Sequence, residues 1–281
     1  EFLKDYKYSV IFTCNDFSST LKKAKEIIPL ENTYENDYLY TSFVKPVAYS
    51  MDGYYFLKFN LAYAAIHPLT QEEFLTKYPF LVVFHEKGEL IEFRFDVLKR
   101  VFLSDKKEPT IYSNLIAEMS DYFKEHFECD LIPLNLDFMV NVCKRDENVK
   151  LIAQSMKLPN GGNAQLDVGN NQEYILPFIG ELRSLLNDNQ AELEKVPDFR
   201  EALEQFMFEM EEMSDYPWIE LLWENEIKTR SNRVKFVFNY MNKSYCLIQY
   251  YYSNVLIGME RMNYVIEYIV NHRNDDTTQN E

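Results

Sequence analysis

Glycine, histidine and cysteine are scarce in this chain of 281 residues, which contains 7 glycines, 4 histidines and 4 cysteines. A loop that cradles phosphate groups needs several glycines close together, because only then can backbone N–H groups approach the anion. The adjacent pair Gly161-Gly162 lies between two strand-like runs, and no GK[ST] or GxGxxG pattern follows it. The sequence therefore predicts a hairpin turn at these glycines and no nucleotide-binding loop.

The histidines and cysteines are too dispersed to indicate a metal centre. Zinc and similar metals need clustered nitrogen and sulfur ligands, and no two cysteines form a CxxC pair. His126 and Cys129 are three residues apart, but no second ligand pair accompanies them. We therefore expect no metal, no cofactor and four reduced, mostly buried thiols. The four cysteines are Cys14, Cys129, Cys143 and Cys246.

Long apolar runs and an excess of positive charge are also missing. No stretch approaches the roughly 18 to 20 apolar residues that a membrane helix needs, and no signal-type segment opens the chain. The chain carries 45 acidic against 29 basic residues, which gives a net charge of −16. A polyanionic surface disfavours nucleic acid and anionic membranes as partners, although it leaves room for a local basic site. We expect a soluble, cytoplasmic protein without a membrane partner.

Aromatic residues, in contrast, are abundant, with 21 Tyr and 21 Phe among 47% hydrophobic residues. This composition is sufficient for a full core. Strand-like runs and amphipathic helical runs follow one another without regular βαβ alternation, so we predict an α+β fold of antiparallel hairpins with flanking helices. We expect an α+β N-terminal half (1–145) and an α+β C-terminal half (146–272), packed as one globular unit. A disordered polar tail (273–281) follows.

The strongest local signal is a hairpin over Phe80–Asp96, with a turn at Lys87-Gly88 in which glycine supplies the positive φ. One face is expected to be core, and its residues are Phe80, Val82, Phe84, Ile91, Phe93 and Phe95. The other face carries His85, Glu92, Arg94 and Asp96. We interpret this polar face as solvated, with Arg94 between two acidic partners, so that truncation of Arg94 costs little stability. An acid–base or metal role would require a cleft above it.

Further along the chain, apolar residues at helical spacing predict helices over 109–127, 136–144, 177–186, 197–213 and 258–271. Thr70 and Glu73 resemble a capping box, which predicts a short helix before Pro79. The predicted helix over 197–213 has an apolar stripe, which consists of Phe199, Ala202, Leu203, Phe206, Met207 and Met210.

One group of residues resembles the site of metal-dependent nucleases. Asp215 is followed, about ten residues later, by Glu226-Ile227-Lys228, and such sites use acidic side chains to hold a divalent ion while lysine orients water. The surrounding residues Glu224-Asn225-Glu226 are polar, and no second hydrophobic strand frames the motif. The motif is therefore a weak catalytic candidate.

A compact basic island consists of Lys228, Arg230, Arg233 and Lys235, and tyrosines follow it. Basic residues beside aromatic ones can bind single-stranded nucleic acid, although a solvated loop is the simpler interpretation. Conversely, the segment from Glu192 to Asp215 contains nine acidic residues. This acidic segment is either solvated or docks a basic partner.

The sequence favours a non-catalytic interaction or regulatory protein that acts within a protein complex, because catalytic motifs are missing and aromatic residues suit interfaces. The alternative is a metal-dependent nucleic-acid-processing enzyme or a nucleic-acid-binding accessory protein. Its site would be Asp215, Glu226 and Lys228, or the face from Glu92 to Asp96. Whether the chain is an enzyme, and whether it forms a homo-oligomer, is left open.

Overall fold

The computed structural model describes residues 1–27, 38–51, 53–66, 69–99, 110–146, 148–157, 162–167, 179–212, 214–224, 231–251 and 258–273. They belong to two compact units. The first combines Glu1–Leu136 with Asn239–Glu281, and the second is the segment Asp137–Phe238 between them. Within the described ranges, no helix has both the length and the apolar character needed to cross a membrane.

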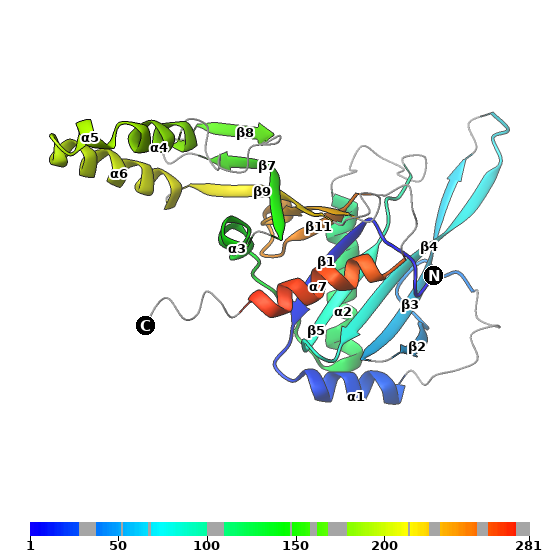
Figure 1. Cartoon of the computed structure of the whole chain (residues 1–281). Helices are drawn as coiled ribbons and strands as arrows, with labels where there is room; N and C mark the ends of the chain where they lie inside the picture. Colours follow the sequence, from blue (N-terminus) through cyan, green and yellow to red (C-terminus); the bar gives the residue numbers. More distant parts are fainter. Residues whose placement is uncertain are drawn as a thin grey trace. The chain divides into compact units, whose positions relative to one another are not determined.

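In the first unit, the described residues form seven strands that pair antiparallel in the order β2-β3-β4-β5-β1-β11, with β6 also paired to β1 (Figure 1). Neighbours in this order are often distant in the sequence, since β1 pairs with both β5 and β11. The strands are β1 (Tyr8–Thr13), β2 (Val47–Met51), β3 (Tyr54–Ile66), β4 (Glu73–His85), β5 (Leu90–Phe95), β6 (Ile132–Pro133) and β11 (Leu247–Tyr250).

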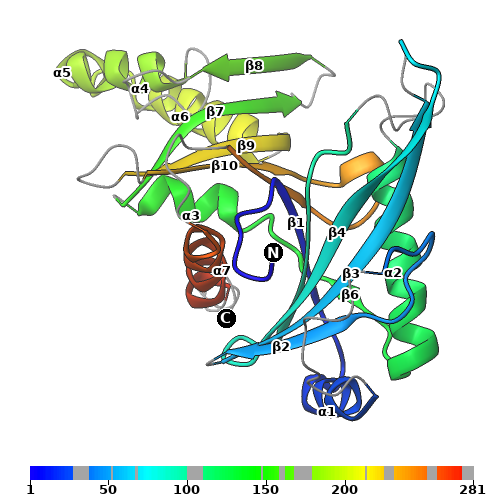
Figure 2. The same ribbon diagram turned by 90° about the vertical axis from the view of Figure 1, so that its right-hand side faces the viewer.

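Helices cover both faces of this sheet. In Figure 2, α1 (Phe17–Ile27) and α2 (Thr110–Phe127) lie on one face, and α7 (Glu260–His272) lies on the other. The N-terminal segment shares the α7 face, because the backbone N–H of Met259 donates to the carbonyl of Leu3 at 3.0 Å. The central part of this sheet is therefore enclosed between two layers.

The α2 face is an aromatic core. The ring centroids of Phe84 and Phe93 lie 5.9 and 5.8 Å from that of Phe123 in α2, and Phe95 lies 5.5 Å from Tyr112. Such pairs add about 0.5–1.5 kcal/mol each to the free energy of burial. These rings belong to the predicted core face of the first hairpin, which the structure confirms.

Local signals explain where the two helices on this face begin and end. Asp16 caps α1, because its carboxylate accepts from the backbone N–H of Ser19 at 2.8 Å. After α2, Glu128 takes a positive φ of 53°, and the N–H of Cys129 returns to the carbonyl of Phe123. The helix therefore ends at a residue in the left-handed conformation, which is a common way for an α-helix to terminate.

Within its described part, the second unit contains four antiparallel strands in the order β10-β9-β7-β8, together with four helices. Helices α4 and α6 lie side by side (Figure 1), because Leu182 and Leu186 pack against a small core of Met207 and Met156. The elements are α3 (Met139–Arg145), β7 (Val149–Lys157), β8 (Asn163–Asp167), α4 (Ile179–Asp188), α5 (Gln190–Leu193), α6 (Pro197–Glu212), β9 (Asp215–Trp223) and β10 (Asn232–Val237).

The predicted α+β fold, with hairpins flanked by amphipathic helices, is wrong. The chain is mostly a large antiparallel sheet of 11 strands, and the helices are few by comparison. Period-two patterns identify a hairpin but do not show which strands join its edges. The edge of β5 is paired by β1 rather than covered by a helix, so the hairpins merge into a sheet.

Two local predictions are also wrong. The capping-box pattern at Thr70 and Glu73 does not open a helix, because Glu73 begins β4 and pairs with Ile66 of β3. Glycine does not supply the positive φ of the first hairpin, where Glu89 does so at 52°.

The five predicted helices are confirmed as α2, α3, α4, α6 and α7, with ends shifted by a few residues. Tail residues 274–281 lie outside the described ranges, and all four cysteines are free, three of them buried.

Candidate functional site

The polar face of the first hairpin is buried, which corrects its interpretation as solvated. The register places His85 opposite Leu90 and Arg94 opposite Leu81, as expected. However, the side chains of both Glu92 and Arg94 are 0% exposed, because α7 lies over this face of the sheet. One feature of the sequence indicated this burial. Leu81 and Val83 lie on the same face, and apolar residues on a face favour its packing against another element.

His85, Glu92 and Arg94 form one hydrogen-bonded network. Glu92 Oε2 lies 2.8 Å from His85 Nε2, and it accepts from Arg94 Nε at 2.8 Å and from Nη2 at 2.6 Å. Arg94 Nη2 also donates to Asn263 Oδ1 of α7 at 2.7 Å. The network therefore joins β4, β5 and α7. Asp96, the fourth residue of the predicted face, accepts instead from the backbone N–H of Lys7 at 3.0 Å.

Burial and charge decide the ionisation of this network. Burial acts to raise the pKa of Glu92, but the Arg94 guanidinium and the His85 hydrogen bond outweigh it, so the pKa is lowered. Burial lowers the pKa of His85, although Glu92 opposes that shift. We therefore assign an ionised Glu92 and a neutral His85. An ionised carboxylate only accepts hydrogen bonds, so His85 Nε2 carries the proton and Nδ1 is an acceptor.

A second buried ion pair ties α7 to the N-terminal segment. Arg261 Nη2 donates to Asp5 Oδ2 at 2.6 Å, and the two side chains are 2% and 7% exposed. Burial raises the pKa of Asp5 even though the Arg261 charge opposes the shift. The α7 face thus holds two buried ion pairs among apolar residues such as Leu81 and Val83, in contrast to the aromatic α2 face.

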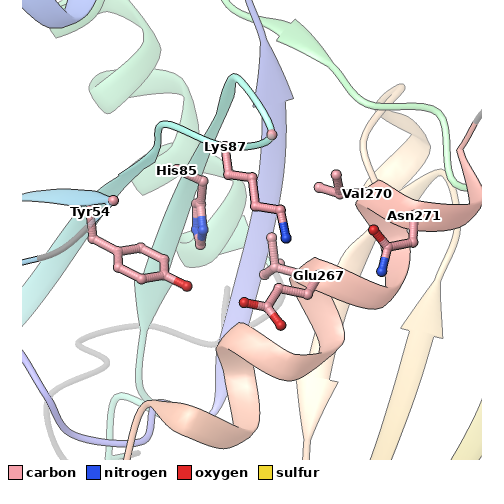
Figure 3. A pocket seen from close by; sticks show the side chains of 9 residues that line it. Tyr54, His85, Lys87, Glu267, Val270 and Asn271 are labelled. Carbon is pink, nitrogen blue, oxygen red and sulfur yellow. The ribbon is translucent and has the colours of Figure 1, made fainter.

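A pocket of about 270 Å³ opens on the α7 face, beside the β4–β5 turn. Its described lining residues come from the start of β3, the β4–β5 turn and α7. In Figure 3, the side chains of Tyr54, His85, Lys87 and Glu267 extend toward a common space. The lining residues are Gly53, Tyr54, His85, Lys87, Gly88, Ile266, Glu267, Val270 and Asn271.

Gly88 is the point at which the turn and α7 approach each other. A Cβ atom at this position would lie 2.7 Å from Cγ2 of Val270, which is closer than real Cβ contacts. The carbonyl of Gly88 also accepts from Arg273 Nη1 at 2.9 Å. The glycine is therefore explained by close packing at the pocket rather than by backbone conformation.

The arrangement provides an oriented histidine, but the described lining places no aliphatic hydroxyl or thiol beside it. A carboxylate that fixes one imidazole nitrogen is the arrangement used to orient a general base. None of the described lining residues is a serine, a threonine or a cysteine. The pocket is therefore suited to binding a small molecule, with His85 as one of its polar contacts.

The nuclease-like motif is only partly within the described residues. Asp215 is exposed and begins β9, while Glu226 and Lys228 belong to residues 225–230, which are not described. The prediction that no second strand frames the motif was wrong, because β9 precedes this segment and β10 follows it. At about 3.3 Å per residue, Asp215 lies roughly 26 Å from Trp223 at the other end of β9. This placement does not favour a shared metal site, and the motif stays a prediction.

The basic island also lies partly outside the described residues, since Lys228 and Arg230 belong to the segment 225–230. The structure brings the other two members onto β10, where they contact β9. Arg233 pairs with Glu220, and Lys235 Nζ lies 3.5 Å from the ring centroid of Trp218. Both described cations are therefore engaged with neighbours of the same unit. Within the described ranges, no group of three or more His, Cys, Asp or Glu could hold a metal ion.

No protein-family model matches this sequence, and no curated protein matches it significantly. The functional conclusion therefore rests on the residues themselves.

Helix α6 exposes part of the apolar stripe that its sequence pattern predicted. Phe199 and Phe206 are 61% and 54% exposed, although Met207 on the same helix is buried against Met156. Phe208, on the other side of the helix, is 57% exposed. The amphipathic pattern correctly predicted the helix, but it could not show that the neighbouring elements leave half of the stripe uncovered.

A second exposed apolar surface is the far end of the β3–β4 hairpin. The strands pair with each other as far as Ile66 and Glu73, beyond the reach of β2 and β5, and they form an arm (Figure 1). Leu75 on this arm is 62% exposed and Leu69 near its tip is 88% exposed. A two-stranded ribbon of this kind is only marginally stable by itself.

Proposed function

We propose that this chain is a non-catalytic interaction protein that works within a protein complex and docks its partner through α6. The carrying observation is the exposed stripe of this helix. Phe199, Leu203 and Phe206 follow i, i+4, i+7 spacing, which is the pattern of a helix that binds in a groove. Burial of one such phenylalanine contributes about 1.5–3 kcal/mol. Two phenylalanines on one stripe are thus a sufficient anchor for a specific contact.

Charge defines the chemistry of the partner. Acidic residues surround the stripe, and Asp198, Glu204 and Glu209 are exposed on α6 itself. Arg200 pairs with Glu204 at 2.8 Å and compensates only part of this charge. The complementary surface is therefore an apolar groove with lysine and arginine at its rim. Acidic residues in this segment are Glu192, Glu194, Asp198, Glu201, Glu204, Glu209, Glu211, Glu212 and Asp215.

The test begins with affinity capture from a native extract, with nucleic acid digested in a parallel sample. The captured protein is then purified, and its affinity is measured for the wild type and for the variants Phe199→Ser/Phe206→Ser, Phe208→Ser and Leu75→Ser. We expect Phe199→Ser/Phe206→Ser to lose the partner and Phe208→Ser, the matched control on the opposite side of the helix, to retain it. The affinity should fall as salt rises, because the rim contact is electrostatic.

Three outcomes would contradict this proposal. One is a partner that all variants bind equally well. Another is a partner lost only in Leu75→Ser, which would move the docking surface to the β3–β4 arm. The third is binding that disappears when nucleic acid is digested, which would favour the accessory role on nucleic acid.

A further inference from the structure

The pocket beside His85 is not used by the proposed docking through α6, and it offers a distinct set of polar groups. His85 is almost buried at its inner wall, with 5% exposure, whereas Lys87 and Glu267 are exposed at the rim. The Tyr54 ring lies 5.3 Å from that of His85 in an edge-on contact, and the Tyr54 hydroxyl donates a hydrogen bond to the Glu267 carboxylate. The pocket therefore has an inner wall of defined geometry and a charged entrance.

His85 presents a hydrogen-bond acceptor to a ligand. Its Nε2 donates to the ionised Glu92, which the two contacts from Arg94 hold in place. Its Nδ1 has no hydrogen-bond partner among the described residues. An imidazole ring that is held in one tautomer, with one nitrogen lone pair available, is preorganised to accept a hydrogen bond from a bound molecule.

The rim presents one charge of each sign from two different elements. Lys87 comes from the β4–β5 turn and Glu267 from α7, and Figure 3 shows both side chains directed into the same space. Neither forms an ion pair with a described residue. Opposite charges placed close together without a bond between them are suited to a ligand that carries both charges.

The remaining lining limits the size of the ligand. Gly53 and Gly88 contribute no side chains, while Ile266 and Val270 provide an apolar wall. The volume of about 270 Å³ is slightly below the range of about 300–1,000 Å³ that is typical of drug-sized ligands. The ligand is therefore small, with a polar end and a short apolar part.

We propose that this pocket binds a small zwitterion of the α-amino-acid class. Its ammonium group donates to Glu267 and to Nδ1 of His85, and its carboxylate contacts Lys87. A short apolar side chain lies against Ile266 and Val270. The neutral state of His85 matters here, because a protonated imidazole would repel the ammonium group.

The test is calorimetric titration of the full chain with L-alanine and L-valine as probes. Propylamine and propionate carry one charge each and serve as matched analogues. We expect both amino acids to bind and each analogue to bind at least about tenfold more weakly, since a charge-assisted contact is lost. Amide shifts at Tyr54, Lys87 and Glu267 in NMR spectra should locate the site.

Variants of the rim separate binding from folding. Glu267→Gln and Lys87→Gln alter exposed side chains, so the fold should survive, and each should weaken binding by about 10- to 100-fold. Glu260→Gln, also exposed on α7 but outside the pocket, should bind as the wild type does. The proposal is overturned if neither amino acid binds, if propylamine binds as tightly as L-alanine, or if neither rim variant changes the affinity.

Discussion

At the scale of single residues, the central finding is a charged group inside the sheet. Arg94 is fully buried and bonded to Glu92, so its loss would leave a carboxylate buried without its cation. Breaking a buried ion pair from one side is far more destabilising than removing an exposed one, because the remaining charge keeps its desolvation cost. This burial reverses the expectation that Arg94 is a minor surface residue.

Arg94→Ala should therefore destabilise the chain about as much as Phe93→Ala does. We expect a loss of about 3–5 kcal/mol for each, from the uncompensated Glu92 in one case and the cavity in the other. Arg200→Ala, in an exposed pair on α6, should leave the free energy of unfolding nearly unchanged. Urea unfolding measures all three, and an Arg94 variant as stable as the Arg200 variant would contradict the buried network. The double variant Glu92→Gln/Arg94→Met should recover part of the loss.

His85 should make stability depend on pH below neutrality. Its pKa in the folded chain is lowered by burial, so the unfolded chain binds the proton more readily. The contribution of neutral His85 to the free energy of unfolding is complete above about pH 6.5, the ordinary pKa of histidine. It is lost as the pH falls through the pKa of His85 in the folded chain. Glu92, whose pKa is also lowered, acts in a separate window below about pH 4.5.

His85→Gln keeps a donor for Glu92 but removes the titration. Its free energy of unfolding, from denaturant melts between about pH 8 and pH 5, should fall less steeply than that of the wild type. His126→Gln alters an exposed histidine and should follow the wild-type curve. Equal slopes for the wild type and His85→Gln would show that His85 is not held neutral.

At the scale of elements, the β4–β5 turn and α7 depend on each other. Gly88 leaves no room for a Cβ atom beside Val270, and Arg273 at the end of α7 donates to the Gly88 carbonyl. Neither contact is visible from the pattern of either element alone. The turn residue and the helix residue are 182 positions apart, and only the fold brings them together.

Gly88→Ala should cost about 1–3 kcal/mol, because the stiff valine side chain cannot easily move away. Val270→Ala removes the atom that would clash. The double variant should therefore lose less than the sum of the two single losses, as a thermal or urea double-mutant cycle measures. Strictly additive losses would show that the turn and α7 do not meet at these atoms.

At the scale of the whole molecule, charge argues against a role in nucleic-acid chemistry. The net charge is −16, and the two described members of the basic island are engaged by Glu220 and Trp218. Affinity for nucleic acid depends on cations that are available to phosphates. The composition and the contacts of the described residues therefore lead to the same expectation.

Purified protein should neither bind nor cleave single- or double-stranded nucleic acid at physiological salt. Addition of Mg²⁺ or Mn²⁺ should not change this, and charge reversal at Arg230 and Arg233 should have no further effect. The control is Glu226→Gln, which retains the size of the side chain. Metal-dependent cleavage that this single substitution abolishes would establish the nuclease alternative and contradict the interaction proposal.

Local elements could largely be predicted from the sequence. Period-two alternation identified the β4–β5 hairpin with its register, and helical spacing identified α2, α6 and α7. These patterns are readable because neighbours along the chain are neighbours in the element. The Thr70–Glu73 capping pattern failed because pairing with β3 outweighed a local helix signal.

The sequence by itself determined the elements, the aromatic core face and the acidic charge, since these depend on short-range pattern and composition. Only the tertiary structure decided what covers each surface. The return of β11 and α7 to the first unit buried Glu92 and Arg94 and created the pocket at His85. In the second unit, limited packing left Phe199 and Phe206 exposed. Burial is a property of contacts between distant segments, so identical periodicity can produce either a core stripe or an exposed one.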